Sequence, residues 1–209
     1  MISFILIVLP VYEELLYSAK YGGVKAGEIK IVWHRDSLNH IKCYKETKGI
    51  FSFVFRVKNW HESISDSHFV TRRLEKEINE GKYHKYQLIN IVNGYAVYDD
   101  GDTVEVIEGA KDIISLIHWL RTQELIPGDT ITVPFHSDKK NYMIKTYVTD
   151  VIVDDEECVL LKPDLTGIKA FGGEGGLLLY YNKAKIPVLL KIKFLWGYLE
   201  AKLEKRECR

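Results

Sequence analysis

The segment from Leu16 to Trp33 constrains the fold of this chain most, because it holds two alternating apolar stretches on either side of a glycine pair. Glycine adopts a positive φ at little cost, so Gly22-Gly23 predicts a tight turn between two half-buried strands. The segment therefore predicts an antiparallel hairpin near the start of the chain. It indicates no reaction.

The composition fits one β-rich domain. The chain has 209 residues, 46% of them hydrophobic, which is enough for a full core. Its aromatic residues are spread through alternating segments, as on the faces of a pleated sheet. Lys plus Arg and Asp plus Glu are equal at 29 each, so no basic field would hold a nucleic-acid backbone. We expect a single domain over residues 12–204 and no nucleic-acid partner.

The two ends of the sequence differ from the rest. Residues 2–9 are apolar and have the length of the apolar part of an export signal, but no Lys or Arg precedes them and no small-x-small cleavage site follows. A bilayer span needs roughly 20 apolar residues, so this run is too short to cross a membrane. We expect residues 1–11 to be either the remnant of an export signal or a leader, and residues 205–209 to be a charged tail.

Turn signals divide the remaining chain into strands. Phe51, Phe53, Phe55 and Val57 alternate with Ser52, Arg56 and Lys58, and predict a strand with one aromatic face. Asn93-Gly94 predicts a two-residue hairpin. A turn at Asn79-Glu80-Gly81 predicts another hairpin, although the spacing of four along residues 70–78 would also suit a helix. Further strands are predicted at 103–107, 130–136, 142–153, 158–162, 176–181, 186–195 and 198–203.

One helix interrupts the strands. Apolar residues at helical spacing follow Asp112, which is a suitable N-cap, and Arg121 stands near the C-terminal end, where a positive charge is favourable. Strands and helices do not alternate, which disfavours a parallel sheet. The sequence therefore predicts a mainly β fold with one packed α-helix at about residues 112–121.

No motif predicts a metal, a cofactor or catalysis. The seven histidines contain neither His-x-His nor His-Glu-x-x-His, and no Cys-x-x-Cys is present. Asp99-Asp-Gly-Asp102 lacks the distal Glu of a calcium loop and fits a turn. The glycines at 172–176 lack the Lys-Ser/Thr of a phosphate loop. The pairing of Cys43, Cys158 and Cys208 stays open, with at most one disulfide between them.

Several segments resemble one known family. The segments YSAKYGGVKAGE at 17–28, TKGIFSFVFRVK at 47–58, DIISLIHWLR at 112–121 and GYLEAKL at 197–203 are similar to the bacterial envelope family called domain of unknown function 3108 (DUF3108). The resemblance runs from about residue 12 to residue 203. It implies a strongly curved antiparallel sheet or half-open barrel, and a periplasmic or outer-membrane-associated location. It transfers no catalytic residue, and the full export signal expected of the family is missing here.

The leading interpretation is a non-catalytic envelope protein without a cofactor that binds an apolar or lipid ligand on the concave face of the sheet. The candidate lining residues, which could equally fill a solid core, are Phe51, Phe53, Phe55, Trp60, Trp119 and Tyr147. The alternative is an envelope scaffold that acts through contacts with a partner protein. The third is an enzyme whose site is assembled from His61, Asp66, His68 and His136.

Overall fold

The computed structural model describes residues 11–166, 168–170, 173–174, 176–194 and 197–209. Within them, one sheet of fourteen antiparallel strands has the order β8-β7-β6-β5-β4-β3-β2-β1-β16-β15-β14-β11-β10-β9. These strands are β1 (Tyr12–Tyr21), β2 (Val24–Arg35), β3 (Asn39–Thr47), β4 (Lys58–Ser65), β5 (Thr71–Glu80), β6 (Tyr83–Val92), β7 (Tyr95–Tyr98), β8 (Thr103–Glu105), β9 (Thr130–Ser137), β10 (Lys140–Val153), β11 (Glu156–Pro163), β14 (Leu177–Asn182), β15 (Pro187–Phe194) and β16 (Gly197–Cys208). The predicted mainly β fold with a curved antiparallel sheet is confirmed.

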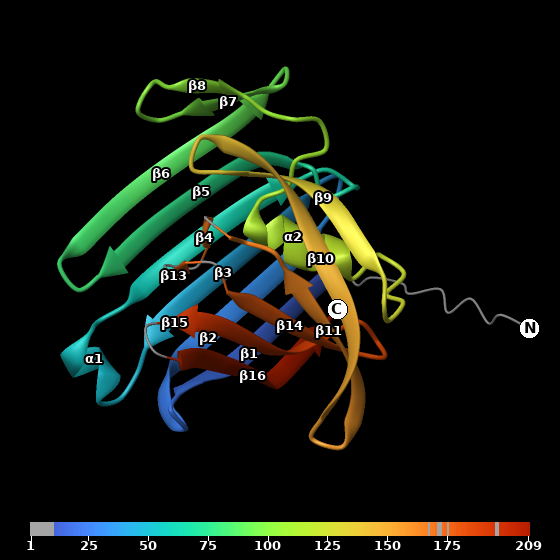
Figure 1. Cartoon of the computed structure of the whole chain (residues 1–209). Coiled ribbons are helices and arrows are strands. Elements are labelled where there is room, and N and C mark those ends of the chain that lie inside the picture. Colours follow the sequence, from blue (N-terminus) through green and yellow to red (C-terminus); the bar gives the residue numbers. More distant parts are fainter. Residues whose placement is uncertain (1–10, 167, 171–172, 175, 195–196) are drawn as a thin grey trace, which may run out of the picture.

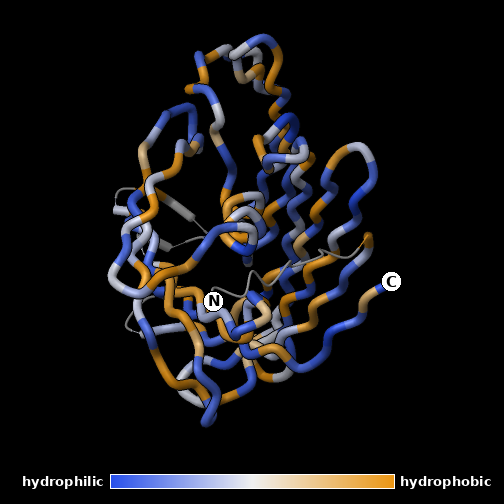
Figure 2. The backbone as a smooth tube through the Cα atoms, turned by 90° about the vertical axis from the view of Figure 1, so that its right-hand side faces the viewer, coloured by the Kyte–Doolittle hydropathy of each residue, from blue (hydrophilic) through white to orange (hydrophobic). Residues whose placement is uncertain are grey.

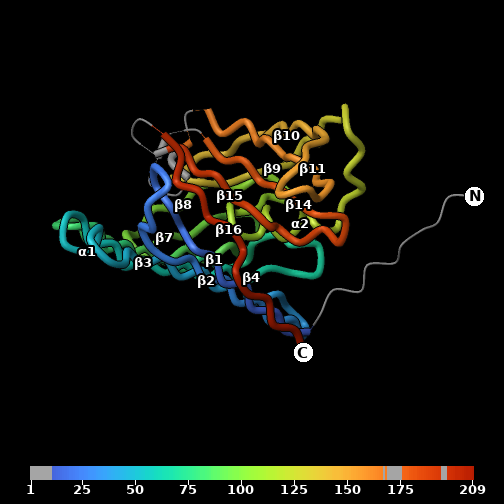
Figure 3. The backbone as a smooth tube through the Cα atoms, turned by 90° about the horizontal axis from the view of Figure 1, so that it is seen from below, coloured from blue at the N-terminus to red at the C-terminus, as the bar shows by residue number. Residues whose placement is uncertain are grey.

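The sheet curves around one helix, α2 (Ile113–Leu120). Strands β1–β4 form one wall and strands β9–β11 the opposite wall, with α2 between them (Figures 1 and 3). A second pair of strands, β12 (Lys169–Ala170) and β13 (Gly173–Glu174), forms a separate small sheet. No helix in the described part of the chain is long and apolar enough to cross a membrane.

The first and last strands lie side by side in the middle of the sheet. Strand β16 runs between β1 and β15, and its last residues pair with the start of β1, with Cys208 opposite Glu13. Residues 205–208, predicted as a charged tail, therefore complete a strand, and this prediction was wrong. Residues 1–10, predicted as a leader or signal remnant, lie outside the described residues.

Tight turns join most neighbouring strands as the sequence predicted. Gly22 and Gly23 have φ of 57° and 81°, and Asn93 and Gly94 have φ of 52° and 80°. Two successive residues with positive φ give a turn whose twist matches that of the two strands it joins. Hydrophilic and hydrophobic residues alternate along the strands (Figure 2), so each strand presents one face to the core.

Side chains close the barrel where the strand ladder does not. The two edge regions meet through Tyr98 Oη and His136 Nε2 at 2.7 Å, and through Asn141 Nδ2, which donates to the Glu105 carbonyl at 2.8 Å. Lys139 reaches across to Asp100 at 2.6 Å. Both sheet edges are therefore tied to each other, which protects them from pairing with another chain.

The strand predicted at residues 51–57 is wrong, because the chain reverses direction there. Thr47 and Val57 are hydrogen-bonded at the base of the connection between β3 and β4. Phe51–Val54 form the single-turn helix α1, in which no residue is buried. Alternation alone predicted a strand, but Phe51–Val54 pair with no strand of the described chain, and Val57 forms only an isolated bridge with Glu80 at the end of β5.

Candidate functional site

The structure does not bring the six predicted aromatic residues together. Phe51, Phe53 and Phe55 lie on or beside α1, outside the barrel. Trp60 is on the outer face of β4, where its Nε1 donates to Glu77 Oε2 at 2.8 Å. Tyr147 is exposed on the outer face of β10.

Trp119 lies on α2, packs against the core and has Lys111 Nζ 4.9 Å from its ring centroid. Of the six, it alone belongs to the interior, so the prediction of a shared aromatic lining gains no geometric support.

Most of the concave face is a solid apolar core. Inward residues of β1–β3 pack through α2 against inward residues of β9–β11, β14 and β15. The largest fully buried side chains here are Trp33, Tyr17, Tyr181 and Phe135. Tyr17 and Tyr181 donate their hydroxyls to the carbonyls of Pro187 and Ile117, both at 2.8 Å. This part of the interior is therefore filled by protein.

A second part of the concave face is polar. On β4 the inward residues are Asn59, His61, Ser63 and Ser65, all of them buried. Trp60, Glu62 and Ile64 face outward on the same strand. The strand thus turns its polar residues inward, which reverses the usual rule for a half-buried strand.

The serines belong to a cluster that fixes the start of α2. Asp112 accepts hydrogen bonds from the backbone N–H of Ile114 at 2.8 Å and of Ser115 at 3.1 Å. Its other oxygen accepts from the hydroxyls of Ser63, Thr71 and Ser115. The predicted N-cap is confirmed, and this buried carboxylate is fully occupied in holding the helix to β4 and β5.

We expect Asp112→Asn to lower the free energy of unfolding by about 1–2 kcal/mol, because an amide offers only one acceptor oxygen in place of two. The loss should appear as a lower midpoint in urea denaturation. An unchanged midpoint would show that the cluster does not hold the helix.

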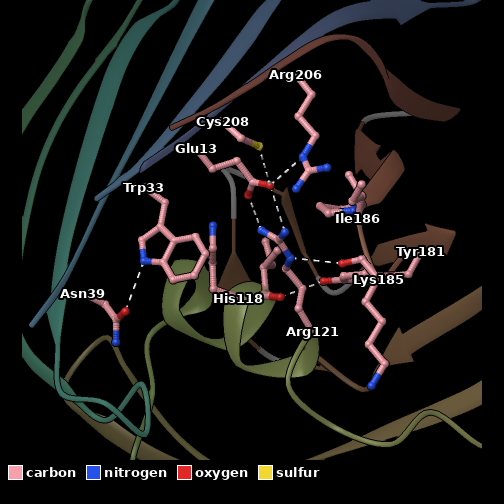
Figure 4. A network of polar contacts seen from close by, with 12 residues as sticks. Glu13, Trp33, Asn39, His118, Arg121, Tyr181, Lys185, Ile186, Arg206 and Cys208 are labelled. Atoms are coloured by element: carbon pink, nitrogen blue, oxygen red, sulfur yellow. Dashed lines mark hydrogen bonds and ion pairs between the residues drawn. The ribbon is translucent and has the colours of Figure 1, made fainter. Parts of the chain in front are cut away.

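A buried ion pair fixes the other end of α2 (Figure 4). Arg121 forms a bidentate ion pair with Glu13, in which Nη2 lies 3.0 Å from Oε1. Its Nε donates to the Lys185 carbonyl at 3.0 Å. Arg206 adds a bond to Glu13 Oε1 at 2.8 Å. Burial raises the pKa of Glu13, but the hydrogen bonds of both arginines and the charge of Arg121 outweigh it and hold that pKa below the ordinary value.

His118 lies beside this ion pair and has one nitrogen without a partner. Its ring centroid is 5.5 Å from that of Trp33, and its Nδ1 is 3.2 Å from the Ile114 carbonyl oxygen. Its Nε2 has no hydrogen-bond partner. Burial, with a smaller contribution from Arg121, lowers the pKa of His118 to about 4, so the ring is neutral at neutral pH. The contacts of Arg121 thus hold the end of α2 to β1 and to the turn before β15.

The strongest candidate site is the basic cluster formed by Lys45, His61 and Lys76. The strand register places them together: Lys45 is opposite Asn59, the inward neighbour of His61 on β4, and His61 is opposite Lys76. All three therefore point to the concave side of β3, β4 and β5. The buried amide of Gln87 on β6 follows next to Lys76.

The electrostatics of the basic cluster are unfavourable. Burial lowers the pKa of His61 well below its ordinary value, and the charges of Lys45 and Lys76 lower it further. Burial also lowers the pKa of both lysines. His61 is 8% exposed and its Nε2 has no hydrogen-bond partner. The two lysines attract an anion by their charge, and the neutral ring of His61 between them can add a hydrogen bond.

Nearby carboxylates partly offset the charges of the basic cluster, since Asp138 and Asp112 raise the pKa of Lys76 against the larger effect of burial. The charge of Glu80 likewise raises the pKa of Lys45, and Glu80 Oε1 accepts from Asn59 Nδ2 at 2.7 Å. Among the ion pairs that the described residues form, none involves Lys76 or His61. No group of acidic, histidine or cysteine side chains suited to a metal occurs in the described part of the chain.

The residues proposed for an enzyme site have separate local roles. Asp66 accepts from the backbone N–H of His68 and of Val70, each at 3.0 Å, and so forms the turn between β4 and β5. His136 bonds to Tyr98 and to Asn141 where the barrel closes. His61 belongs to the basic cluster. The geometry offers no nucleophile with an adjacent base among these four residues.

The comparisons with known proteins agree with this architecture. The model of the family described as protein of unknown function (DUF3108) matches residues 16–204. The chain belongs to the DUF3108 family. No curated protein matches the sequence.

Two solved structures resemble this DUF3108 protein. One is a β-barrel-like protein of the domain of unknown function DUF1849 from Brucella abortus, with a TM-score of 0.63, 7% identity and coverage of 96% of this chain and 98% of the other. The other is a DUF1089 family protein from Pseudomonas aeruginosa, with a TM-score of 0.34, 9% identity and coverage of 90% and 93%. At 7% identity, the first likeness shows a barrel-like fold and nothing of function.

Proposed function

We propose that this DUF3108 protein is a non-catalytic binding protein of the bacterial cell envelope, whose ligand is a lipid-like amphiphile with an anionic head group. The observation that carries the proposal is the inward-facing basic cluster. The periplasmic or outer-membrane-associated location rests on the family resemblance. The apolar ligand expected from the sequence is thereby narrowed to one with an acidic end.

The cost of the basic cluster supports a role in binding. The charges of Lys45 and Lys76 are partly removed from water and repel each other, and both act unfavourably on the protonated form of His61 between them, so a fold gains nothing by gathering these groups on one face. An anion would reverse this effect, since it would pair with the ammonium groups and supply a partner to His61 Nε2. Removal of the repulsion between the two lysines would therefore contribute to the free energy of anion binding.

Apolar neighbours on the same face could hold the chain of such a ligand. Leu74 and Ile78 stand two residues before and after Lys76 on β5, and both are half-buried. Ile89, opposite Leu74, continues the apolar surface toward β7. An acidic head group at Lys76 and an acyl chain along these residues would match the polar and apolar parts of the face.

Replacing Lys76 separates a binding role from a structural one. We expect Lys76→Gln to weaken the binding of a dansyl-labelled undecanoic acid about tenfold or more, because a charge-assisted contact is lost. The same change should raise the melting temperature of the unliganded protein, since it removes a cation whose pKa burial lowers. Fluorescence titration and thermal denaturation measure the two effects.

The control for that experiment is Lys42→Gln. Lys42 lies on the outer face of β3, where it pairs with Glu62 at 3.2 Å. This variant should bind the probe like the wild type. Equal affinity of all three proteins, or a lower melting temperature of Lys76→Gln, would refute the proposed role of the basic cluster.

The alternative, an envelope scaffold, has less support. A partner that added a strand to β8 or β9 would have to displace the contacts of Tyr98 with His136 and of Asn141 with Glu105. A scaffold would also gain nothing from the basic cluster. An enzyme remains the third proposal. It would be supported if His61→Ala abolished a catalytic activity and left the binding of the acid probe unchanged.

A further inference from the structure

We propose that the connection between β3 and β4 is a membrane-docking element, which inserts α1 into the surface of an anionic lipid bilayer. It carries what we call the apolar tip, formed by Ile50, Phe53, Val54 and Phe55. The inference does not depend on the ligand of the basic cluster.

The apolar tip is unusually exposed for residues of its type. Ile50, Phe53 and Val54 are 69%, 91% and 79% exposed, and Phe55 is exposed as well. The tip stands away from the body of the barrel at one end (Figures 1 and 3). Four adjacent large apolar side chains held in water are unfavourable, and such patches mark surfaces that another phase or partner covers.

The backbone holds the apolar tip in place. Phe55 N–H donates to the Phe51 carbonyl at 2.8 Å, and Ser52 Oγ donates to the Gly49 carbonyl at 2.7 Å. The Gly81 N–H donates to the Arg56 carbonyl at 2.8 Å, which fastens the connection to the turn between β5 and β6. The tip is therefore a fixed protrusion and does not depend on binding to take its shape.

Basic residues surround the apolar tip. Arg56, Lys58 and Lys82 are exposed, and none takes part in the ion pairs formed among the described residues. A hollow of about 460 Å³ beside Phe53 is lined by Arg56 and Lys58 and by the ion pair of Lys48 with Glu46, so two of its three cations are left to attract an anion. Apolar side chains at the point of a protrusion and cations around its base match the acyl chains and the phosphates of an anionic membrane.

A bilayer fits this surface better than a protein groove does. Tyr83 is exposed beside the tip, and Tyr44, Trp60 and Tyr86 follow on the outer face of adjacent strands. Aromatic residues with a polar end favour the interface between acyl chains and water. The apolar point, the cations and the aromatic residues are three kinds of group that a membrane surface accommodates.

Vesicle co-sedimentation tests the proposal with the full chain. The probe is a vesicle of phosphatidylcholine with phosphatidylglycerol, compared with phosphatidylcholine alone. We expect the wild type to bind the anionic vesicles more strongly, and Phe53→Asp to reduce that binding about tenfold or more, since it removes one large apolar anchor and adds a repelled charge. Because Phe53 is exposed, the melting temperature should not change.

The matched control is Ile152→Asp, which changes a residue that is 71% exposed on β10 and remote from α1. It should bind vesicles like the wild type. All variants carry the same residues 1–10, so a contribution of that apolar run cancels. The proposal is overturned if the wild type does not bind anionic vesicles, if both variants lose binding equally, or if Phe53→Asp only disrupts self-association or a protein complex.

Discussion

Replacing Arg121 with methionine is expected to lower the free energy of unfolding by about 3–5 kcal/mol, because it leaves the carboxylate of Glu13 buried without its main partner. Arg121 and Glu13 are 2% and 1% exposed, and they join the end of α2 to β1. The same guanidinium also binds the Lys185 carbonyl in the turn before β15. Urea denaturation at neutral pH measures the loss.

Arg206→Gln is the matched control for Arg121→Met. Arg206 bonds to the same oxygen of Glu13, but its side chain is partly exposed, so we expect a loss below about 1 kcal/mol. The double variant Glu13→Leu with Arg121→Met should recover part of the loss, since neither charge is then buried. Equal losses for Arg121→Met and Arg206→Gln would contradict a central role of the buried pair.

Acid is expected to destabilise the protein through His118. The folded pKa of about 4 lies below the ordinary value of 6.5, so below pH 6.5 the unfolded chain binds a proton that the folded chain does not. Stability from this group is therefore complete above pH 6.5 and is lost as the pH falls toward 4. Between pH 7 and pH 4.5 the loss should be about 2–3 kcal/mol.

His118→Met tests this pH dependence, because methionine has a similar volume and does not titrate. The difference in unfolding free energy between pH 7 and pH 4.5 should shrink by about 2–3 kcal/mol in this variant. His68→Gln, which changes an exposed histidine, should leave the difference as it is in the wild type. If the free energy of unfolding of His118→Met changed between pH 7 and pH 4.5 as much as that of the wild type, His118 would not be the source of the acid sensitivity.

The features that could be predicted from the sequence are those set by neighbouring residues. Gly22-Gly23 and Asn93-Gly94 specify their turns because few residues accept two successive positive φ angles. Asp112 specifies the start of α2 because its side chain satisfies the free N–H groups of the first turn. Such local chemistry is present in the sequence before any tertiary contact forms.

The strand predicted at residues 51–57 shows the limit of periodicity. The spacing of two between Phe51, Phe53 and Phe55 is typical of a strand, but whether a strand forms there depends on a partner with which to pair. The pairing of β3 with β4 instead places these residues in the connection. Two of these phenylalanines, Phe53 and Phe55, instead form part of the apolar tip, which we propose as a membrane-docking surface.

The basic cluster could not be predicted because it depends on register across three strands. Lys45, His61 and Lys76 are separated by long stretches of sequence, and a shift of one residue in either pairing would turn some of them outward. One signal was present. Asn59, His61, Ser63 and Ser65 alternate with Trp60 and Ile64, and a search for polar as well as apolar alternation would have marked β4 as a strand with a polar inner face.

The central claim is that the basic cluster holds an anionic amphiphile, and native mass spectrometry of the gently purified protein tests it most directly. The wild type should carry a bound species with the mass of an acyl-chain acid or acidic lipid, released as an anion on collisional activation. The double variant Lys45→Gln with Lys76→Gln should appear at the mass of the chain alone. A wild type without any bound species, or the same species retained by the double variant, would contradict the account.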